Sequence, residues 1–255
     1  MAKRQPITAR RIKTRRIDFE YPTDDLPRHY MGGGDLVMSH VVTVLSCLFP
    51  EGEDFFVRSV RQYRDGITDP ELKSQVAGFI GQEASHGRQH RLFNERLGQL
   101  GYPTRRIDRM TRFGLLLQER VLPKSVNLAT TAALEHYTAT LAQVLLSDPQ
   151  ARAMFDVDEI RSMFLWHALE ESEHKSVAFD VFQTVSGSHR IRVVVMNAVT
   201  LGFILGVVAH TTASLLGDRS ARDLRRLARS LRRLRSSPWL TPAVVRHSST
   251  KAVVS

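Results

Sequence analysis

The segments that decide the fold are FIGQEASHGRQHRLFNERL (residues 79–97) and FLWHALEESEHKSVAFDV (residues 164–181). Each repeats apolar residues at steps of three or four, which is the spacing of one face of an α-helix. Each apolar face is interrupted by a glutamate and, three residues later, a histidine: Glu83 with His86, and Glu171 with His174. Because ionisable side chains are rarely buried unless they are paired or bind a metal, these faces predict two core helices that share a polar site.

Two further segments with helical periodicity carry one glutamate each on the apolar face. Glu53 lies in the segment 51–67, and Glu135 lies in the segment 124–146. A single acid could form a local salt bridge, but four at compatible positions indicate a shared cation site. Four-helix bundles bind two iron or manganese ions with one glutamate from each of two helices and a Glu-x-x-His pair from each of the others. We therefore predict an all-α fold, a ferritin-like four-helix bundle with additional hydrophobic and basic helices at the C-terminus.

The predicted metal ligands are Glu53, Glu83, His86, Glu135, Glu171 and His174. The carboxylate-rich set suits two iron ions, with manganese as an alternative and zinc a poorer fit. A buried network of ion pairs is the competing interpretation, but few basic residues share these faces to complete it. His90 and His167 each lie one helical turn from a predicted ligand. We predict both as catalytic residues that move a proton or orient a ligand, with direct metal binding as the open alternative.

Other ionisable residues near these motifs receive lesser roles. Glu51 is a substitute ligand for Glu53 if Pro50 bends the first helix and shifts its register. Glu170 and Glu173 flank the second motif at the wrong angle for the shared face, which predicts surface exposure or a supporting contact for each. Cys47 is predicted to be a small buried apolar residue rather than a nucleophile.

The chain divides into four predicted parts. Residues 1–34 form a basic irregular segment, and residues 35–187 form the metal-binding bundle. A hydrophobic helix follows at 188–217, and an arginine-rich helix with a flexible tail occupies 218–255. Within the bundle, the sequence Asp69-Pro70-Glu71 is a strong helix start, and the last bundle helix is predicted to run without a break from about Asp158 to about Ser186.

Charge and hydropathy predict where the protein is found. The 255-residue chain has a formal net charge of +10, and residues 218–235 hold eight arginines. Residues 193–216 carry no formal charge and are long enough to cross a membrane, or to form a fifth helix packed on the bundle or in a homodimer. One cysteine and the absence of a recognisable signal peptide predict a cytoplasmic protein, with association with the inner face of the membrane as an alternative. An anionic lipid surface is thus a candidate partner. Nucleic acid is disfavoured because the basic stretches lack interleaved aromatic residues.

The motifs at 79–97, 128–142 and 164–181, together with FPEGEDFFVRSVRQYRDGITDPELK (49–73), resemble a bacterial family of predicted metal-dependent hydrolases. The similarity covers roughly residues 30–217. The family is related in pattern to ferritin-like di-iron proteins, which include amine oxygenases and other hydroxylases. The resemblance implies a metal-dependent enzyme.

Three functions follow from this site. We favour O2-dependent oxidation or oxygenation of a small organic substrate at a di-iron centre, because the ligand set suits iron. The alternative is a metal-dependent hydrolase in which two metals activate a water, as the family name states. A metal-binding or storage protein without a substrate is the third, although the apolar segment 193–216 argues against a soluble storage cage. The identity of the substrate stays open.

Overall fold

The computed structural model describes residues 12–21 and 26–240, which are helical apart from turns and connecting segments. The elements are α1 (Leu36–Arg61), η1 (Arg64–Gly66), α2 (Pro70–Gln99), α3 (Thr104–Val121), α4 (Lys124–Ser147), α5 (Pro149–Ala153), α6 (Asp158–His174), α7 (Val177–Val185), α8 (His189–Leu216), η2 (Arg219–Arg222), α9 (Leu224–Arg235) and η3 (Pro238–Leu240). Within these ranges β-pairing is limited to one isolated bridge, between Met31 and Phe155. The prediction of an all-α fold is confirmed, and the ferritin-like relationship stays a prediction.

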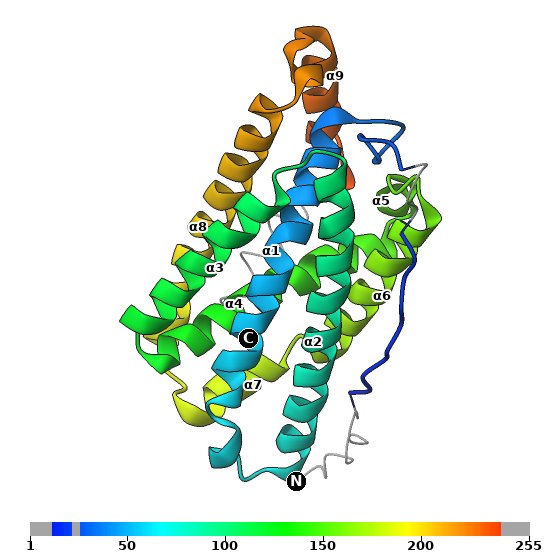
Figure 1. Cartoon of the computed structure of the whole chain (residues 1–255). Helices are drawn as coiled ribbons and strands as arrows, with labels where there is room; N and C mark the ends of the chain where they lie inside the picture. Colours follow the sequence, from blue (N-terminus) through cyan, green and yellow to red (C-terminus); the bar gives the residue numbers. More distant parts are fainter. Residues whose placement is uncertain (1–11, 22–25, 241–255) are drawn as a thin grey trace.

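The helices that carry the predicted ligands form the centre of the molecule. α1 packs along α2 and α4 packs along α6, while α3 and α8 cover the other side of α1 (Figure 1). Two apolar clusters fill the bundle: one around Phe56, Phe79 and Val181, the other around Phe93 and Met163. The polar positions of α2 fall between Phe79 and Phe93, so the ionisable residues form a layer between the two clusters.

The helix boundaries follow the local signals in most places. The Asp69 carboxylate caps α2 by accepting the backbone N–H of Glu71, and α1 continues through Pro50 to Arg61. One prediction is corrected: the helix that begins at Asp158 ends at His174, and α7 follows after a turn at Lys175–Ser176. The turn redirects the chain so that the apolar side chains of α7 enter the first cluster. The apolar spacing of the sequence continues past His174, but the helix ends there because α7 buries its apolar side chains in a different direction.

An extended segment at the N-terminal end of the described chain lies along α2 and α6 (Figure 1). We call residues 12–21 the N-terminal strap. Two glutamine side chains of α2 hold its backbone: Gln82 Nε2 donates to the Lys13 carbonyl at 3.2 Å, and Gln89 Nε2 donates to the Ile17 carbonyl at 2.8 Å. The strap is therefore held by main-chain contacts as well as by side chains such as Ile12, which enters the first cluster.

Candidate metal centre

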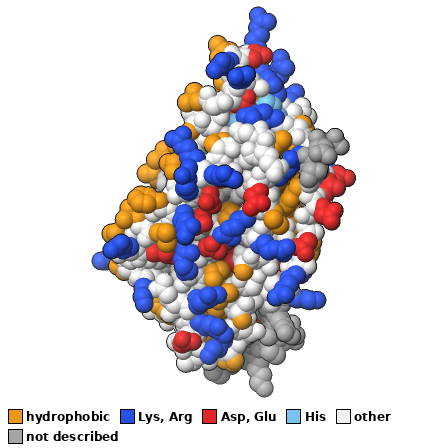
Figure 2. Space-filling model, viewed as in Figure 1, with side chains coloured by type: hydrophobic (Ala, Val, Ile, Leu, Met, Phe, Trp, Pro, Cys, Tyr) orange, Lys and Arg blue, Asp and Glu red, His pale blue; other side chains and the backbone are white. Residues whose placement is uncertain are grey.

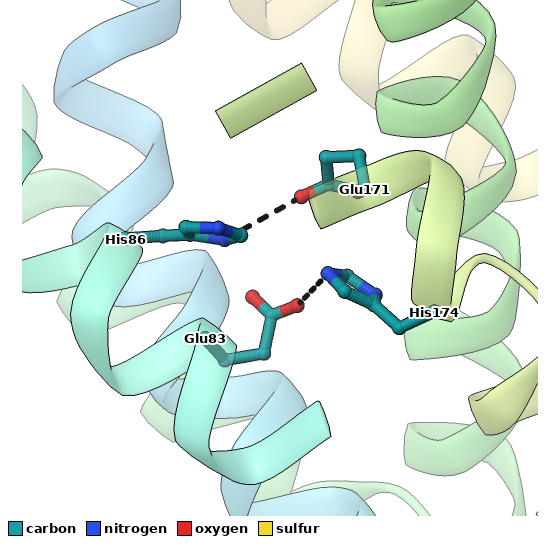
Figure 3. Close-up of side chains that lie close together, drawn as sticks. All are labelled: Glu83, His86, Glu171 and His174. Atoms are coloured by element: carbon teal, nitrogen blue, oxygen red, sulfur yellow. Dashed lines mark ion pairs between the residues drawn. The ribbon is translucent and has the colours of Figure 1, made fainter. Parts of the chain in front are cut away.

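The six predicted ligands meet in the polar layer between the two apolar clusters. Each is at most 2% exposed. Glu53 comes from α1, Glu83 and His86 from α2, Glu135 from α4, and Glu171 and His174 from α6. Figure 3 shows the two Glu-x-x-His pairs of α2 and α6 pointing toward one another across the interface. The spacing of three residues places each glutamate and histidine on the same helical face, as predicted.

His174 lies between two glutamates. Its Nε2 atom is 3.1 Å from Glu83 Oε1, and its Nδ1 atom is 3.1 Å from Glu135 Oε2. The imidazole therefore joins α6 to both α2 and α4. On the same helix, Glu171 Oε2 accepts a hydrogen bond from the Thr138 hydroxyl at 2.6 Å, which is a second contact between α4 and α6.

His86 is oriented by a carboxylate outside the predicted ligand set. Its Nε2 atom lies 3.1 Å from Glu170 Oε2, and its Nδ1 atom faces Glu171 Oε1 at 3.8 Å. When Nε2–H donates to Glu170, the lone pair of Nδ1 points into the site. Arg15 of the strap donates to Glu170 at 3.1 Å and also binds Glu173. A histidine held by a carboxylate through its other nitrogen is the usual arrangement around protein-bound metals.

His167 and His90 form a hydrogen-bonded chain that leads into the site. The Asn94 amide nitrogen donates to the Ser46 carbonyl at 3.0 Å, which leaves Asn94 Oδ1 to accept the Ser46 hydroxyl at 2.7 Å. Ser46 Oγ must then accept from His90 Nδ1 at 2.9 Å, and His90 Nε2 accepts from His167 Nδ1 at 2.7 Å.

This assignment leaves His167 Nε2 without a proton when the ring is neutral. The atom lies 2.9 Å from Glu171 Oε1 and 3.7 Å from Glu53 Oε1. One candidate ligand group consists of His167, Glu53 and His86, whose nearest donor atoms lie within 4.8 Å of one another. A second such group consists of Glu83, His86, Glu171 and His174. The geometry brings two adjacent cation-sized sites together.

The fit of a cation is tested by the polar atoms that nothing else satisfies. Both carboxylate oxygens of Glu53 and of Glu83 are buried without a hydrogen-bond partner among the described residues. The same holds for Glu135 Oε1, His86 Nδ1 and His174 Nε2, although His174 Nε2 and Glu83 Oε1 lie 3.1 Å apart as an ion pair without hydrogen-bond geometry. A buried polar group without a partner costs roughly 1–3 kcal/mol, and more when it is charged. Several such atoms facing one another are what a site for divalent metals requires.

Burial and mutual repulsion control the protonation of the carboxyl groups. Burial raises the pKa of Glu53 and of Glu83 well above the ordinary value, and neighbouring carboxylates raise each further. Burial and the charge of Glu171 raise the pKa of Glu135 to about 7. These acids keep protons near neutral pH, in the place that a metal would take.

The imidazoles and the remaining acid behave differently. Burial and the neighbouring His167 lower the pKa of His86 well below its ordinary value, so it is neutral and able to bind a metal. Burial opposes charge on His174 as well, but Glu135 and Glu171 raise its pKa. The pKa of Glu171 is lowered despite its burial, mainly because His174 favours the carboxylate.

The residues that were predicted to have lesser roles lie outside the ligand set. Glu51 points toward Arg91 at 3.9 Å, and α1 keeps its register through Pro50, so Glu53 is the residue in the centre. Cys47 is buried in a small apolar cluster, as predicted. Glu170 is buried rather than exposed and makes the supporting contact that was the other predicted role.

A second group of possible ligands is satisfied by protein partners. His40 Nε2 and His29 Nε2 both lie within 3.1 Å of Asp218 Oδ2, which also accepts from Arg28 Nε. The other nitrogen of His40 meets the Ser214 hydroxyl at 2.7 Å. This network joins the end of α8 to α1, and we interpret it as structural.

Sequence reasoning missed the residues that support the ligands. Arg15 belongs to a basic segment without periodicity, and Thr138 is one of several threonines on α4. Only Glu170 gave a signal, because it sits next to a predicted ligand on a helix whose buried face is wide.

Comparison with known proteins gives one match. A sequence model of a family described as "Predicted metal-dependent hydrolase" matches residues 13–251, which is nearly the whole chain. No curated protein and no solved structure matches the chain.

Proposed function

The chain belongs to the family of predicted metal-dependent hydrolases, and we propose that it is a hydrolase with a dinuclear metal centre. The observation that carries the proposal is the set of buried donor atoms from Glu53, Glu83, Glu135, His86 and His174 that face one another without hydrogen-bond partners among the described residues. The family supports hydrolysis as the reaction. The carboxylate-rich set supports manganese or iron over zinc as the metal.

The residues would divide into two ligand groups. Glu83, Glu171 and His174 would hold one ion, Glu53 and His167 would hold the other, and His86 belongs to both candidate groups. Bound metals would supply a water that is acidic enough to act as a nucleophile, and positive charge for a developing oxyanion.

The chain's own residues would fix the ligands of the centre. Glu170, held by Arg15, keeps Nδ1 of His86 directed inward. His167 shares a hydrogen bond with His90 at 2.7 Å, and His90 shares one with Ser46 at 2.9 Å. With Nε2 of His167 on a metal, this chain would fix the tautomer and the orientation of the ring.

The test is hydrolysis by metal-loaded protein. We expect Mn(II)-loaded protein to cleave an activated carboxylic ester or phosphodiester, and we expect activity to disappear when a chelator removes the metal. Glu83→Gln should lose activity together with metal, because it removes a charged ligand. Glu173→Gln is the matched control: Glu173 lies on the same helix as Glu171, binds Arg15, and is outside the ligand groups.

Two results would contradict hydrolysis. One is the absence of cleavage of every ester and phosphoester class by fully metal-loaded protein. The other is cleavage that survives in Glu83→Gln after its metal is lost.

Oxidation by O2 is the second candidate, and one specific observation favours it. One glutamate from each of two helices with a Glu-x-x-His pair from each of two others is the ligand pattern of carboxylate bundles that hold two iron ions, and α1, α4, α2 and α6 supply that pattern here. Anaerobic loading with Fe(II) followed by O2 would distinguish the candidates. Rapid O2 consumption with a new near-ultraviolet absorption, in protein that lacks hydrolase activity, would favour oxidation.

A further inference from the structure

α8 exposes apolar side chains along its outward face, while its inward face is mixed: Val195 is buried and Val199 packs against the first cluster, beside polar side chains. Thr211 and Ser214 are buried, and the Thr200 hydroxyl meets the Tyr137 hydroxyl of α4. The outward face holds Val194, Leu201, Ile204, Leu205, Val208 and Leu216, which are 52–82% exposed. On a helix at the surface of a protein in water, the outward face is normally polar. The outward face of α8 is therefore adapted to a surrounding less polar than water.

α3 extends the same apolar surface. Met110, Phe113, Leu117 and Val121 recur at helical spacing along it and are 49–69% exposed. Ile107 of α3 and Val207 of α8 both pack on the small cluster around Cys47, so the two helices flank α1 on one side. Figure 2 shows hydrophobic side chains along this edge of the molecule. We call the exposed apolar residues of α3 and α8 the apolar edge. Exposed apolar patches of this extent mark an interaction surface.

Arginines lie beside the apolar edge on α3 and beyond its end on α9. α3 carries exposed Arg106, Arg109 and Arg120 beside its apolar stripe, and the eight arginines of 218–235 follow directly after α8. Figure 2 shows Lys and Arg side chains beside the edge and over α9 at the top of the molecule. Two copies of the chain joined through this surface would bring like charges together, whereas an anionic surface complements them.

We propose that the apolar edge, with its fringe of arginines, docks on the surface of an anionic phospholipid bilayer. α8 is long and apolar enough to cross a membrane. However, it packs along its length on α1 and α4 and is tied at its end by the contact of Ser214 with His40. A spanning helix would have to give up these contacts. The geometry points instead to α8 lying in the plane of the interface, with its outward side chains among the upper acyl chains and the arginines at the head groups.

The experiment is flotation of the full-length chain with vesicles. Wild-type protein should bind vesicles that contain phosphatidylglycerol, and it should bind phosphatidylcholine vesicles more weakly. In about 0.5 M salt, where charges are screened within a few ångströms, a part of the binding should remain. The apolar edge supplies that part.

Paired variants separate the two contributions. Leu201→Gln with Leu205→Gln should lower the salt-resistant binding by about tenfold or more, because two apolar side chains that enter the acyl region are replaced by polar ones. Arg225→Gln with Arg232→Gln should lower low-salt binding by roughly 25-fold, since each basic residue contributes about fivefold near an anionic surface. Matched controls are Leu92→Gln with Leu169→Gln, which are exposed leucines of α2 and α6, and Arg61→Gln with Arg64→Gln, which lie outside the apolar edge and α9.

Circular dichroism and metal content check that each variant is folded. Two results would overturn the proposal. One is vesicle binding that the leucine and arginine pairs leave at the wild-type level. The other is a wild-type protein that ignores vesicles and forms a dimer by light scattering, with Leu201→Gln and Leu205→Gln abolishing the dimer. That result would assign the apolar edge to a second copy of the chain.

Discussion

Glu83 is the residue on which the metal centre depends most directly. Both of its carboxylate oxygens are buried without a hydrogen-bond partner among the described residues, and His174 Nε2 lies 3.1 Å from one of them. We expect Glu83→Gln and His174→Ala each to lose most of the bound metal, while Glu173→Gln keeps it. Elemental analysis after identical loading measures the difference. If Glu173→Gln also empties the site, the assignment of ligands on α6 is wrong.

Glu170 should act on the metal through His86 alone. Glu170→Gln keeps an acceptor for His86 Nε2 but removes the negative charge, so the ring becomes a poorer ligand. Partners of this kind change metal affinity by about 10- to 100-fold, and we expect a loss near the lower limit. Competition with a chelator of known affinity gives the value. A Glu170→Gln affinity equal to the wild type would show that His86 needs no orienting carboxylate.

At the scale of elements, the strap depends on glycines of α2. A Cβ atom at Gly78 would lie 2.6 Å from Ile12 Cβ and 2.7 Å from its carbonyl oxygen, closer than real contacts allow. Gly78→Ala must therefore displace the strap. We expect it to destabilise the fold by about 1–3 kcal/mol, as overpacking does.

The control is Gly52→Ala in α1, where a Cβ meets nothing within 4 Å. This change should leave stability the same or increase it, because alanine is the better helix former by about 1 kcal/mol. Urea unfolding of both variants makes the comparison. Equal stability of the two alanine variants would mean that the strap is not packed on α2 in solution.

The elements differ in how well the sequence predicts them. Periodic apolar faces and caps such as Asp69 are local, so the four bundle helices could be predicted from the residues themselves. The break after His174 could not, because it depends on where α7 finds a cluster to enter. The strap could not either, because Gln82 and Gln89 bind its backbone and Arg15 contacts Glu170 on a helix that is distant in the sequence.

The residues of the metal centre also differ in how well the sequence predicts them. The ligand pattern on four helices is visible as acids that interrupt apolar faces, and the structure buries all six residues together. The support of His86 by Glu170 and Arg15 joins segments 155 residues apart, and sequence spacing carries no information on such a contact. The sequence likewise does not predict which side of α8 faces outward, since composition alone does not say which face meets the bundle.

For the molecule as a whole, the stability of the metal-free protein should fall as pH rises, and bound metal should remove most of this dependence. Above about pH 7.5, buried His86 and His90 are neutral in both the folded and unfolded states; between pH 6.5 and 7.5 the unfolded imidazoles still lose protons, which opposes the loss described next but only slightly. Glu53, Glu83 and Glu135 have raised pKa values in the folded state, so they keep protons that the unfolded chain has already released. Stability is therefore lost as pH rises, and His174, with its raised pKa, adds to the loss.

For Glu135 alone, with a pKa of about 7, the loss between pH 6.5 and 8 is on the order of 1 kcal/mol. Metal-free protein should thus unfold at a lower temperature at pH 8 than at pH 6.5. Metal-loaded protein should show a much smaller difference, because a cation replaces the protons. Thermal unfolding in a chelator and in excess metal measures both. Metal-free protein that gains stability over this range would contradict the assignment of protonated acids.

We propose that these four helices hold a dinuclear metal centre, and the metal content of purified protein tests this proposal. Elemental analysis after growth with iron or manganese, or after anaerobic reconstitution and removal of loosely bound ions, should find close to two metals per chain, consistent with the two adjacent candidate groups that share His86. Protein that is folded by circular dichroism and contains no metal after careful reconstitution would show that the four helices hold no metal centre.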